Sequence, residues 1–230
     1  MSAAAMSNDL YRGISLTAGQ PAAAIDLSAD DAASGAYAGA ELLAAAPAQS
    51  GGPRLGNIEY LGFTLPTRGA TIIDVGVIHL RAPGAPPGVY SAYAGDDVEP
   101  YLGLRRGAVG GYLYLAPDYF GEGRTAAYAE LDAATHVAAD LRLFGHIGLR
   151  VMGAGGAAPS MTWSPDRSGA GPYGGSFGAG GARYDAATGV EWAIGRARVS
   201  VTFALEGATP GARSAPPATS SLEAKATWSF

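Results

Sequence analysis

The stretch Leu222-Glu-Ala-Lys-Ala-Thr-Trp-Ser-Phe230 alternates strictly between apolar and polar side chains. Successive side chains of a β-strand point to opposite faces. In a strand, the apolar face of this stretch carries Leu222, Ala224, Ala226, Trp228 and Phe230. The opposite face carries Glu223, Lys225, Thr227 and Ser229. The pattern predicts a strand with one apolar and one polar face.

The same alternation recurs along the whole chain and is clearest over 141–152 and 197–206. It predicts twelve strands, at about 5–17, 21–29, 35–45, 55–65, 70–81, 97–106, 109–117, 126–136, 141–153, 182–195, 197–207 and 221–230. A helix is the alternative for the Ala- and Leu-rich stretch 126–152, but its glycines and its alternation favour strands. Segment 35–45 fits either structure almost equally. Pro100 indicates a bulge, because proline removes a donor from the ladder.

The connections between the predicted strands alternate in length. Short ones follow every second strand, at 30–34, 66–69, 107–108, 137–140 and 196. Longer ones follow the other strands, at 46–54, 82–96, 118–125, 154–181 and 208–220, and only the short first connection, 18–20, departs from this pattern. Short periplasmic turns and long extracellular loops are typical of outer-membrane barrels.

Periodicity alone does not distinguish a soluble β-sandwich from a membrane barrel, because both have strands with one apolar face. Three features favour the barrel. Segments of about ten residues suit a tilted membrane strand, the number of strands is even, and Trp228 and Phe230 fit an aromatic girdle. We therefore predict an all-β fold, a transmembrane antiparallel barrel of 12 strands. Residues 1–230 form a single domain, with the barrel at about 5–230 and a long Gly-rich extracellular loop at 154–181.

Composition and charge exclude several classes of protein. Charged residues make up 15% of the chain, against about 25% in average soluble proteins. There is no cysteine, which excludes disulfides and thiolate metal sites. The net charge of −5 argues against a nucleic-acid partner. No run of 18 uncharged apolar residues predicts a transmembrane helix.

The expected localisation is the outer membrane of a Gram-negative bacterium. The first residues, Met1-Ser-Ala-Ala-Ala, lack the basic and apolar regions of a signal peptide, so we expect the signal to be absent from this sequence. Expected partners are outer-membrane lipid and small hydrophilic solutes or ions. A terminal aromatic on an amphipathic strand also predicts recognition of the C-terminal strand by the outer-membrane insertion machinery.

The chain resembles the TorF-type family of outer-membrane porins over residues 9–230, with interruptions in the long loops. The residues that carry this resemblance are Asp9-Leu-Tyr-Arg-Gly-Ile-Ser15, Asp74-Val-Gly-Val-Ile78 followed by Pro83-Gly84, and Ala116-Pro-Asp-Tyr-Phe-Gly121. The first looks like the opening strand of that family and the third like its Ser-Pro-Asp-Tyr-Phe turn. The family's tyrosine-rich end to the fifth strand is His79-Leu-Arg-Ala in this chain. The resemblance implies a barrel and a channel, and it implies no particular substrate.

The odd or even position of a residue within its strand, here called its parity, predicts whether its side chain faces the interior. The expected pore-lining residues are Asp26, Glu41, Glu59, Asp74, Glu99, Tyr101, Arg105, Tyr112, Tyr114, Glu130, Asp132, Arg142, His146, Arg150, Asp185, Glu191, Arg198, Glu206, Glu223 and Lys225. The expected lipid-facing aromatics are Trp192, Phe203, Trp228 and Phe230. The excess of inward acids predicts a weak cation preference. Glu99, Glu130 and Asp132 are expected to form an acidic wall. That wall would face the arginines Arg142, Arg150 and Arg198.

The best interpretation is a channel for passive diffusion of small hydrophilic solutes or ions. A closed structural or partner-binding barrel is the alternative, because twelve strands lie between eight, whose interior is filled by side chains, and sixteen, which enclose a channel. A lipid-active enzyme is a more distant alternative, and no catalytic residue is assigned. The glycines of 169–174 follow no predicted strand and open no helix, so no cofactor is expected. The three histidines lack metal-ligand spacing, so no metal is expected.

Overall fold

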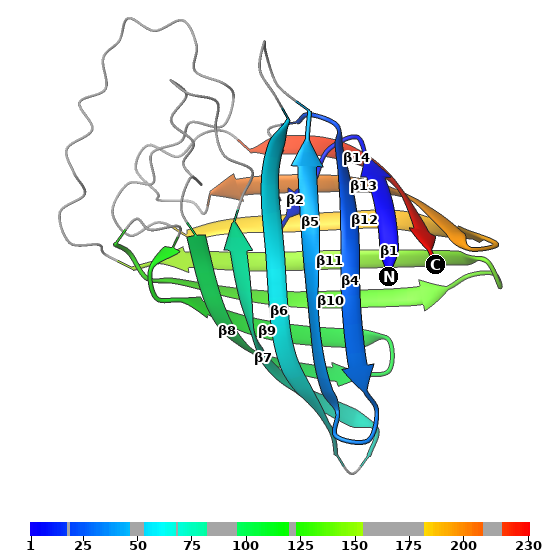
Figure 1. Ribbon diagram of the computed structural model, residues 1–230. Coiled ribbons are helices and arrows are strands. Elements are labelled where there is room, and N and C mark those ends of the chain that lie inside the picture. Colours follow the sequence, from blue (N-terminus) through cyan, green and yellow to red (C-terminus); the bar gives the residue numbers. More distant parts are fainter. Residues whose placement is uncertain are drawn as a thin grey trace, which may run out of the picture.

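The computed structural model describes residues 1–17, 19–46, 53–67, 69–81, 96–119, 123–153, 182–208 and 218–230. Twelve antiparallel strands close into a barrel (Figure 1). They are β1 (Ser2–Met6), β4 (Ala22–Asp31), β5 (Ala36–Ala45), β6 (Arg54–Pro66), β7 (Thr71–Arg81), β8 (Asp96–Arg106), β9 (Val109–Ala116), β10 (Ala126–His136), β11 (Leu141–Met152), β12 (Ala182–Ile194), β13 (Ala197–Ala208) and β14 (Thr219–Ser229). Two short strands, β2 (Leu10–Tyr11) and β3 (Ile14–Ser15), form a separate hairpin. In the described residues, no helix has the length and hydropathy needed to cross a membrane.

The predicted twelve-stranded barrel is confirmed, and every predicted strand after the first agrees with the structure to within two residues at each end. Residues 126–136 and 36–45 are strands, as the alternation favoured. The bulge predicted at Pro100 is absent. β8 pairs with β7 in continuous register through Pro100, which lies opposite Val77. The ladder between β8 and β9 covers only residues 101–106 of β8, so the missing donor of Pro100 interrupts no bond there.

The prediction of a first strand at 5–17 is wrong. The strand β1 ends at Met6, and the chain then leaves the barrel wall. Residues 8–13 read Asn-Asp-Leu-Tyr-Arg-Gly and do not alternate. Arg12 and Gly13 both have positive φ, at 51° and 75°, which turns the chain back on itself between β2 and β3. The stretch that resembles an opening strand is therefore this hairpin.

The five residues of β1 close the barrel. Ser2 lies opposite Ser229 of β14 on one side and Asp26 of β4 on the other. Met6 lies opposite Lys225 and Ala22 in the same two ladders. Closure leaves neither β4 nor β14 with a free edge along this length, which a barrel in an apolar medium requires.

Five short connections lie at one end of the barrel, at 32–35, 67–70, 107–108, 137–140 and 195–196. Both termini lie at this end, where the Phe230 N–H donates to the Met1 carbonyl at 3.2 Å (Figure 1). The two-residue connections each contain a glycine with positive φ, Gly107 at 59° and Gly195 at 61°. A left-handed residue of this kind is what such tight turns need.

The other end of the barrel carries the longer connections, at 7–21, 46–53, 82–95, 117–125, 153–181 and 209–218. The predicted loop 154–181, and the loops around Pro87, Trp163 and Pro216, lie outside the described residues. Both termini at the short-turn end agree with the predicted topology. The assignment of that end to the periplasm stays a prediction.

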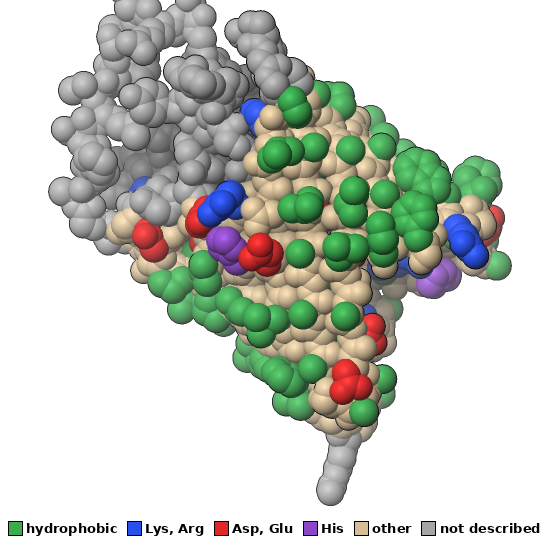
Figure 2. Space-filling model, in the orientation of Figure 1, with side chains coloured by type: hydrophobic (Ala, Val, Ile, Leu, Met, Phe, Trp, Pro, Cys, Tyr) green, Lys and Arg blue, Asp and Glu red, His purple; other side chains and the backbone are tan. Residues whose placement is uncertain are grey.

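The outer surface of the barrel is apolar (Figure 2). Leu61, Ile147 and Phe203 point outward and are 55%, 57% and 44% exposed. A water-soluble protein commonly exposes single side chains of this size, but it rarely exposes a large contiguous apolar surface. Here they recur at alternate positions on most strands of the barrel, for example at Leu102 and Leu104 of β8 and at Leu113 and Leu115 of β9, as expected of a barrel that turns its apolar face to lipid.

The outward and inward faces should respond differently to a buried charge. Val201→Arg and Leu149→Arg place a guanidinium on the apolar outer face and should each lower the free energy of unfolding by about 2–4 kcal/mol near the midplane. The matched control is Ser200→Arg, which points inward opposite Glu191 and should fold normally. A refolding titration in urea measures the difference. Equal effects of the outward and inward variants would contradict the assigned faces.

Candidate functional site: the barrel lumen

The structure places almost every residue predicted to line a pore on the inward face of its strand. Their outward neighbours along each strand are exposed apolar side chains, which fixes the parity. The residues on the inward face are Asp26, Glu41, Asp74, Glu99, Tyr101, Arg105, Tyr112, Tyr114, Glu130, Asp132, Arg142, His146, Arg150, Asp185, Glu191, Arg198, Glu206, Glu223 and Lys225. Whether they line a conducting pore stays a prediction.

Glu59 is the exception, and its predicted inward orientation is wrong. Tyr60 points into the barrel, where its hydroxyl donates to Asp26 at 3.4 Å, so Glu59 points out. Near its long-loop end, β6 carries polar residues on both faces, so the sequence alone does not show which face points inward. On the outside, Glu59 contacts His79 Nδ1 at 3.2 Å, and His79 lies beside Asp96, which Arg81 binds through two hydrogen bonds (Figure 2).

The four aromatics predicted to face lipid all lie on the outer surface. Trp192, Phe203, Trp228 and Phe230 are 53%, 44%, 44% and 75% exposed. Trp192 and Trp228 lie close to the short-turn end, and the Trp192 indole N–H donates to Asp140 at 2.7 Å in the adjoining turn. An indole with its ring in an apolar layer and its N–H bonded to a polar group suits a membrane interface. Contact with lipid stays a prediction.

Inside the barrel, tyrosine rings lie over glycines of neighbouring strands. A Cβ added at Gly62 would overlap Tyr37, and one at Gly76 would overlap Tyr101. The same relation holds for Gly103 beneath Tyr112 and for Gly148 beneath Tyr128. Each glycine thus provides the space for one ring against the wall. This packing accounts for part of the high glycine content of the strands.

The largest feature that the sequence did not predict is the fold of segment 7–17, here called the luminal segment, which turns into the barrel between β1 and β4. Its own hydrogen bonds hold its shape. Asn8 Oδ1 accepts from Ser15 Oγ at 2.6 Å and from Thr17 Oγ1 at 2.9 Å, and the Leu16 N–H donates to the Asp9 carbonyl at 2.9 Å. Thr17 has no exposed surface and Asn8 is 6% exposed.

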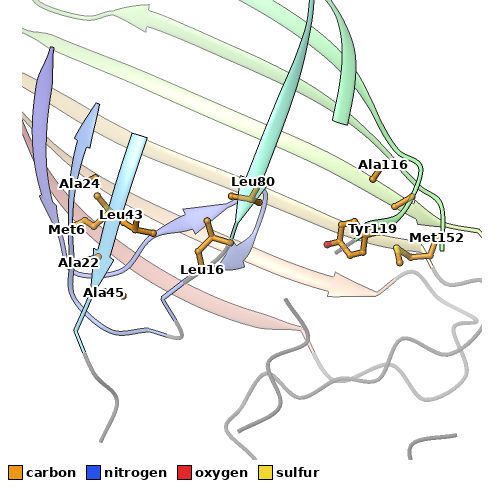
Figure 3. Packing of buried hydrophobic residues seen from close by; sticks show 11 residues of the cluster. Met6, Leu16, Ala22, Ala24, Leu43, Ala45, Leu80, Ala116, Tyr119 and Met152 are labelled. Atoms are coloured by element: carbon orange, nitrogen blue, oxygen red, sulfur yellow. The ribbon is translucent and has the colours of Figure 1, made fainter. Parts of the chain in front are cut away.

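Apolar side chains hold the luminal segment at the long-loop end. Leu16 packs in a cluster with Met6, Leu43 and Leu80, and Figure 3 shows Leu16 close to Leu80. Most of the other members lie at or near the ends of strands that lead into the longer connections, and Tyr119 lies in one of these connections: Ala22, Ala24, Ala45, Ala116, Tyr119, Ala126 and Met152. This end of the interior therefore combines an apolar cluster with charged side chains such as Arg54, Asp97 and Arg183.

Polar contacts join the luminal segment to strands on several sides of the barrel. The Leu10 N–H donates to Glu223 Oε2 on β14 at 3.1 Å, and Arg54 of β6 donates to the Thr17 carbonyl at 2.7 Å. Arg150 of β11 donates to the Arg12 carbonyl at 3.3 Å. The segment is thus attached across the lumen and narrows it.

Arg12 makes the most extensive of these contacts. Its guanidinium forms an ion pair with Glu99 on β8, and both side chains are about 5% exposed. Its Cζ lies 3.7 Å from the ring centroid of Tyr114 and 4.8 Å from that of Tyr128. Burial lowers the pKa of this guanidinium while the facing acidic groups, Tyr11 and Glu99 first among them, raise it, and the net direction is upward. Arg12 therefore remains a cation inside the barrel.

A chain of tyrosines and carboxylates continues around the wall. Tyr37 donates to Asp74 at 2.5 Å, and Tyr114 donates to Glu130 at 2.9 Å. Tyr128 donates to Asp185 at 3.0 Å. These bonds give each of the three hydroxyls an acceptor, and each carboxylate keeps lone pairs that can accept further hydrogen bonds.

His146 lies between two carboxylates. Its Nδ1 is 2.7 Å from Asp132 and its Nε2 is 2.8 Å from Asp185, which is the hydrogen-bonding pattern of an imidazolium. Glu130, Asp132 and His146 bring possible ligand atoms within 4.8 Å of one another. A metal ion there would have to displace the hydrogen bond between His146 and Asp132.

A cavity of about 350 Å³ lies between the luminal segment and the wall. The charged and aromatic residues that line it include Arg12, Tyr114, Glu130, His146, Asp185 and Glu223. Three of them are carboxylates, and Glu99 already pairs with the guanidinium. The cavity is therefore suited to a small polar solute with positive charge.

The predicted division into an acidic wall facing an arginine wall is not what the structure shows. Glu130 and Asp132 lie on β10, which is hydrogen-bonded directly to β11, the strand of Arg142 and Arg150. The two sets of charges are neighbours. Further toward the short-turn end, Arg142 and Arg198 lie 3.7 and 3.9 Å from Glu191, so some of the arginines neutralise nearby acids.

Asp97, Arg183 and the luminal segment are site features that were not predicted. Asp97 is inward and 1% exposed, and Arg183 contacts Glu206 at 2.6 Å. Parity alone assigns the inward positions of Asp97 and Arg183. The luminal segment has a weaker signal, the loss of alternation over 8–13 followed by glycine.

Comparison with known proteins supports the barrel. A family model described as "Bacterial protein of unknown function (Gcw_chp)" matches residues 1–199. The KdgM porin is 11% identical with a TM-score of 0.54, and the match covers 100% of this chain and 98% of that one. The NanC porin is 6% identical with a TM-score of 0.55, and the match covers 100% and 99%. No curated protein matches. At these identities the porins show a shared fold, and the TorF-type resemblance stays a prediction.

The luminal segment should respond to pH through Asp9. Burial raises the pKa of Asp9 to about 6, with Lys225 opposing and Glu223 adding to the rise. An acid whose pKa is higher in the folded protein favours folding most at low pH, and this contribution is lost as pH rises from about 4 to about 6. The melting temperature of the wild type should therefore fall over this range by several degrees more than that of Asp9→Asn. Parallel profiles for the two proteins would show that Asp9 does not couple the segment to pH.

Proposed function

We propose that this chain, which belongs to the family described as "Bacterial protein of unknown function (Gcw_chp)", is an outer-membrane channel for small hydrophilic solutes or ions. The observation that carries the proposal is the closed barrel with an apolar outer face and a charged interior. Burial of charged side chains away from water costs free energy, so a charged interior is expected where the side chains contact water or a polar solute.

In this proposal the luminal segment forms the constriction. It lies across the interior and is attached to β6, β8, β11 and β14 through hydrogen bonds of its side chains and of its backbone N–H and carbonyl groups. Passage would occur beside it or after a limited movement of the hairpin. Solutes would meet Glu130, Asp185 and Glu223 at the cavity, which favours cations over anions.

A closed structural or partner-binding barrel is the second candidate. The burial of Arg12 and Thr17 supports it, because a segment fixed this tightly is also what a permanent plug requires. An enzymatic role has less support. In the described residues His146 bonds two carboxylates and a tyrosine hydroxyl, and not the serine that a Ser–His lipase needs.

Conductance in planar bilayers tests the channel and its selectivity. The wild type should conduct, and its reversal potential in a KCl gradient should show a weak cation preference. Glu130→Gln combined with Asp132→Asn should reduce that preference, because two inward carboxylates are removed. Arg12→Ala should raise the conductance by loosening the luminal segment.

Glu59→Gln is the matched control, because Glu59 is a carboxylate of the same barrel that points outward. It should leave both the conductance and the reversal potential unchanged. A clear anion preference in the wild type would contradict the proposed selectivity. Absence of current from both the wild type and Arg12→Ala would favour the closed barrel.

The orientation of the barrel is part of the proposal. We expect the short turns and both termini in the periplasm and the longer connections outside the cell. Protease added to intact cells should then cut in the loops around Pro87, Trp163 or Pro216. Cleavage confined to 32–35 or 137–140 would reverse the orientation. Outer-membrane lipid and the insertion machinery, acting on the C-terminal strand, are the proposed cellular partners.

A further inference from the structure

The surroundings of Arg12 form a binding site that the luminal segment occupies with its own side chain. The wall contributes Glu99 from β8, Tyr114 from β9 and Tyr128 from β10. A carboxylate beside two tyrosine rings can bind a guanidinium or another organic cation through a charge-assisted pair and cation–π contacts. These side chains belong to the barrel and stay in place if the segment moves.

A second observation indicates that this site has capacity for more positive charge than Arg12 supplies. Asp97 lies two residues before Glu99 on the same inward face and is 1% exposed. Neither of its carboxylate oxygens accepts a hydrogen bond from a donor group among the described residues, and the side chain within hydrogen-bonding reach is that of Glu99, a second carboxylate. Buried polar atoms are almost always bonded, because burial without a partner is costly. A ligand that brings a further hydrogen-bond donor to Asp97, which Arg12 does not supply, would remove the free-energy cost of this burial.

Spacing defines the kind of ligand. The Cα atoms of positions two apart on one strand face are about 7 Å apart, and the side chains of Asp97 and Glu99 approach each other more closely than this. A guanidinium seated between Glu99 and the two rings leaves Asp97 within reach of a second cationic group carried on a short aliphatic chain. Agmatine, which joins a guanidinium to an ammonium through four methylenes, has this arrangement.

We propose that Asp97, Glu99, Tyr114 and Tyr128, here called the cation patch, bind small guanidinium-bearing dications in exchange for Arg12. The patch names a solute class for the proposed channel, and it therefore rests on the proposed function for its role in transport. Arg12 is tethered beside the patch and acts as an internal competitor with a high effective concentration. A dication binds only when the luminal segment has moved away, so its binding favours the displaced position of the segment.

Two variants free the patch by different routes. Arg12→Ala removes the competing guanidinium. Gly13→Ala leaves Arg12 in the chain but displaces the segment, because a Cβ at Gly13 would overlap Asp185 and the residue has a φ of 75°. Both leave the four wall residues intact, so a folding failure in one still leaves the other as a test.

Isothermal titration calorimetry of the detergent-solubilised full chain with agmatine measures the exchange. Both Arg12→Ala and Gly13→Ala should bind agmatine at least about tenfold more tightly than the wild type, because the tethered competitor is gone. Adding Glu99→Gln to either variant should weaken binding by about tenfold or more, because it removes the desolvated charge-assisted pair. Adding Glu59→Gln, on the outer surface, should change nothing.

Methylguanidinium separates the two halves of the patch. Asp97→Asn in the Arg12→Ala background should weaken binding of agmatine and leave binding of this monocation within about twofold, because only the dication reaches Asp97. Equal losses for both probes would overturn the role of Asp97. Binding that is no tighter in either freed variant than in the wild type, or that is insensitive to Glu99→Gln, would overturn the whole inference.

Calorimetry also separates this inference from the proposed function. Tight agmatine binding in a barrel that never conducts would leave the patch standing and contradict the channel. Conductance with cation preference but without agmatine binding in the freed variants would leave the channel standing and overturn the patch.

Discussion

Closure of the sheet by β1 is the constraint on which the rest of the structure depends. Its five residues satisfy one edge of β4 and one edge of β14, which would otherwise present unpaired backbone groups to an apolar medium. β1 stops at Met6, so β14 continues beyond it toward the long loops. There the luminal segment takes over: Ser7 exchanges hydrogen bonds with Ala224, and the Leu10 N–H binds Glu223. The short strand β1 and the luminal segment thus together satisfy the hydrogen-bonding groups along one edge of β14.

The small size of the barrel determines what fills it. Glycines on the inward face let tyrosine rings lie against the wall, and the hydroxyls of those rings reach carboxylates one or two strands away, as Tyr37 of β5 reaches Asp74 of β7. This arrangement lines the wall with rings and leaves space near the centre. The luminal segment enters that space and contacts rings and carboxylates directly. A barrel with bulkier inward residues in place of Gly103 and Gly148 would have no room for both layers.

Alternation was enough to predict the strands from β4 to β14, because most of the outward positions in each strand are apolar. It failed where that regularity ends. Glu59 and Asn57 are polar residues on the outer face of β6, so the strand reads equally well in either parity near its long-loop end. The predicted first strand, 5–17, extended through this segment although residues 8–13 do not alternate. Its actual position depends on contacts with Glu99, Glu223 and Arg54, which are distant in the sequence and which periodicity does not represent.

The way in which the luminal segment is held determines what movement costs. The strand β2 pairs only with β3, so few backbone ladder bonds join this hairpin to the wall. The hairpin is held by side-chain contacts and by the two ends of the segment. Ser7 and Pro21 remain bonded to Ala224 and Ala46 at its two ends, so the hairpin has fixed ends next to an intact barrel. Displacing it would expose Leu16 and break the pair between Arg12 and Glu99, while the ladders of β1 would persist. The main electrostatic interaction lost is the ion pair between Arg12 and Glu99, and a cationic solute can pair with Glu99 in its place. Opening of the lumen is thereby linked to the charge of the solute that enters it.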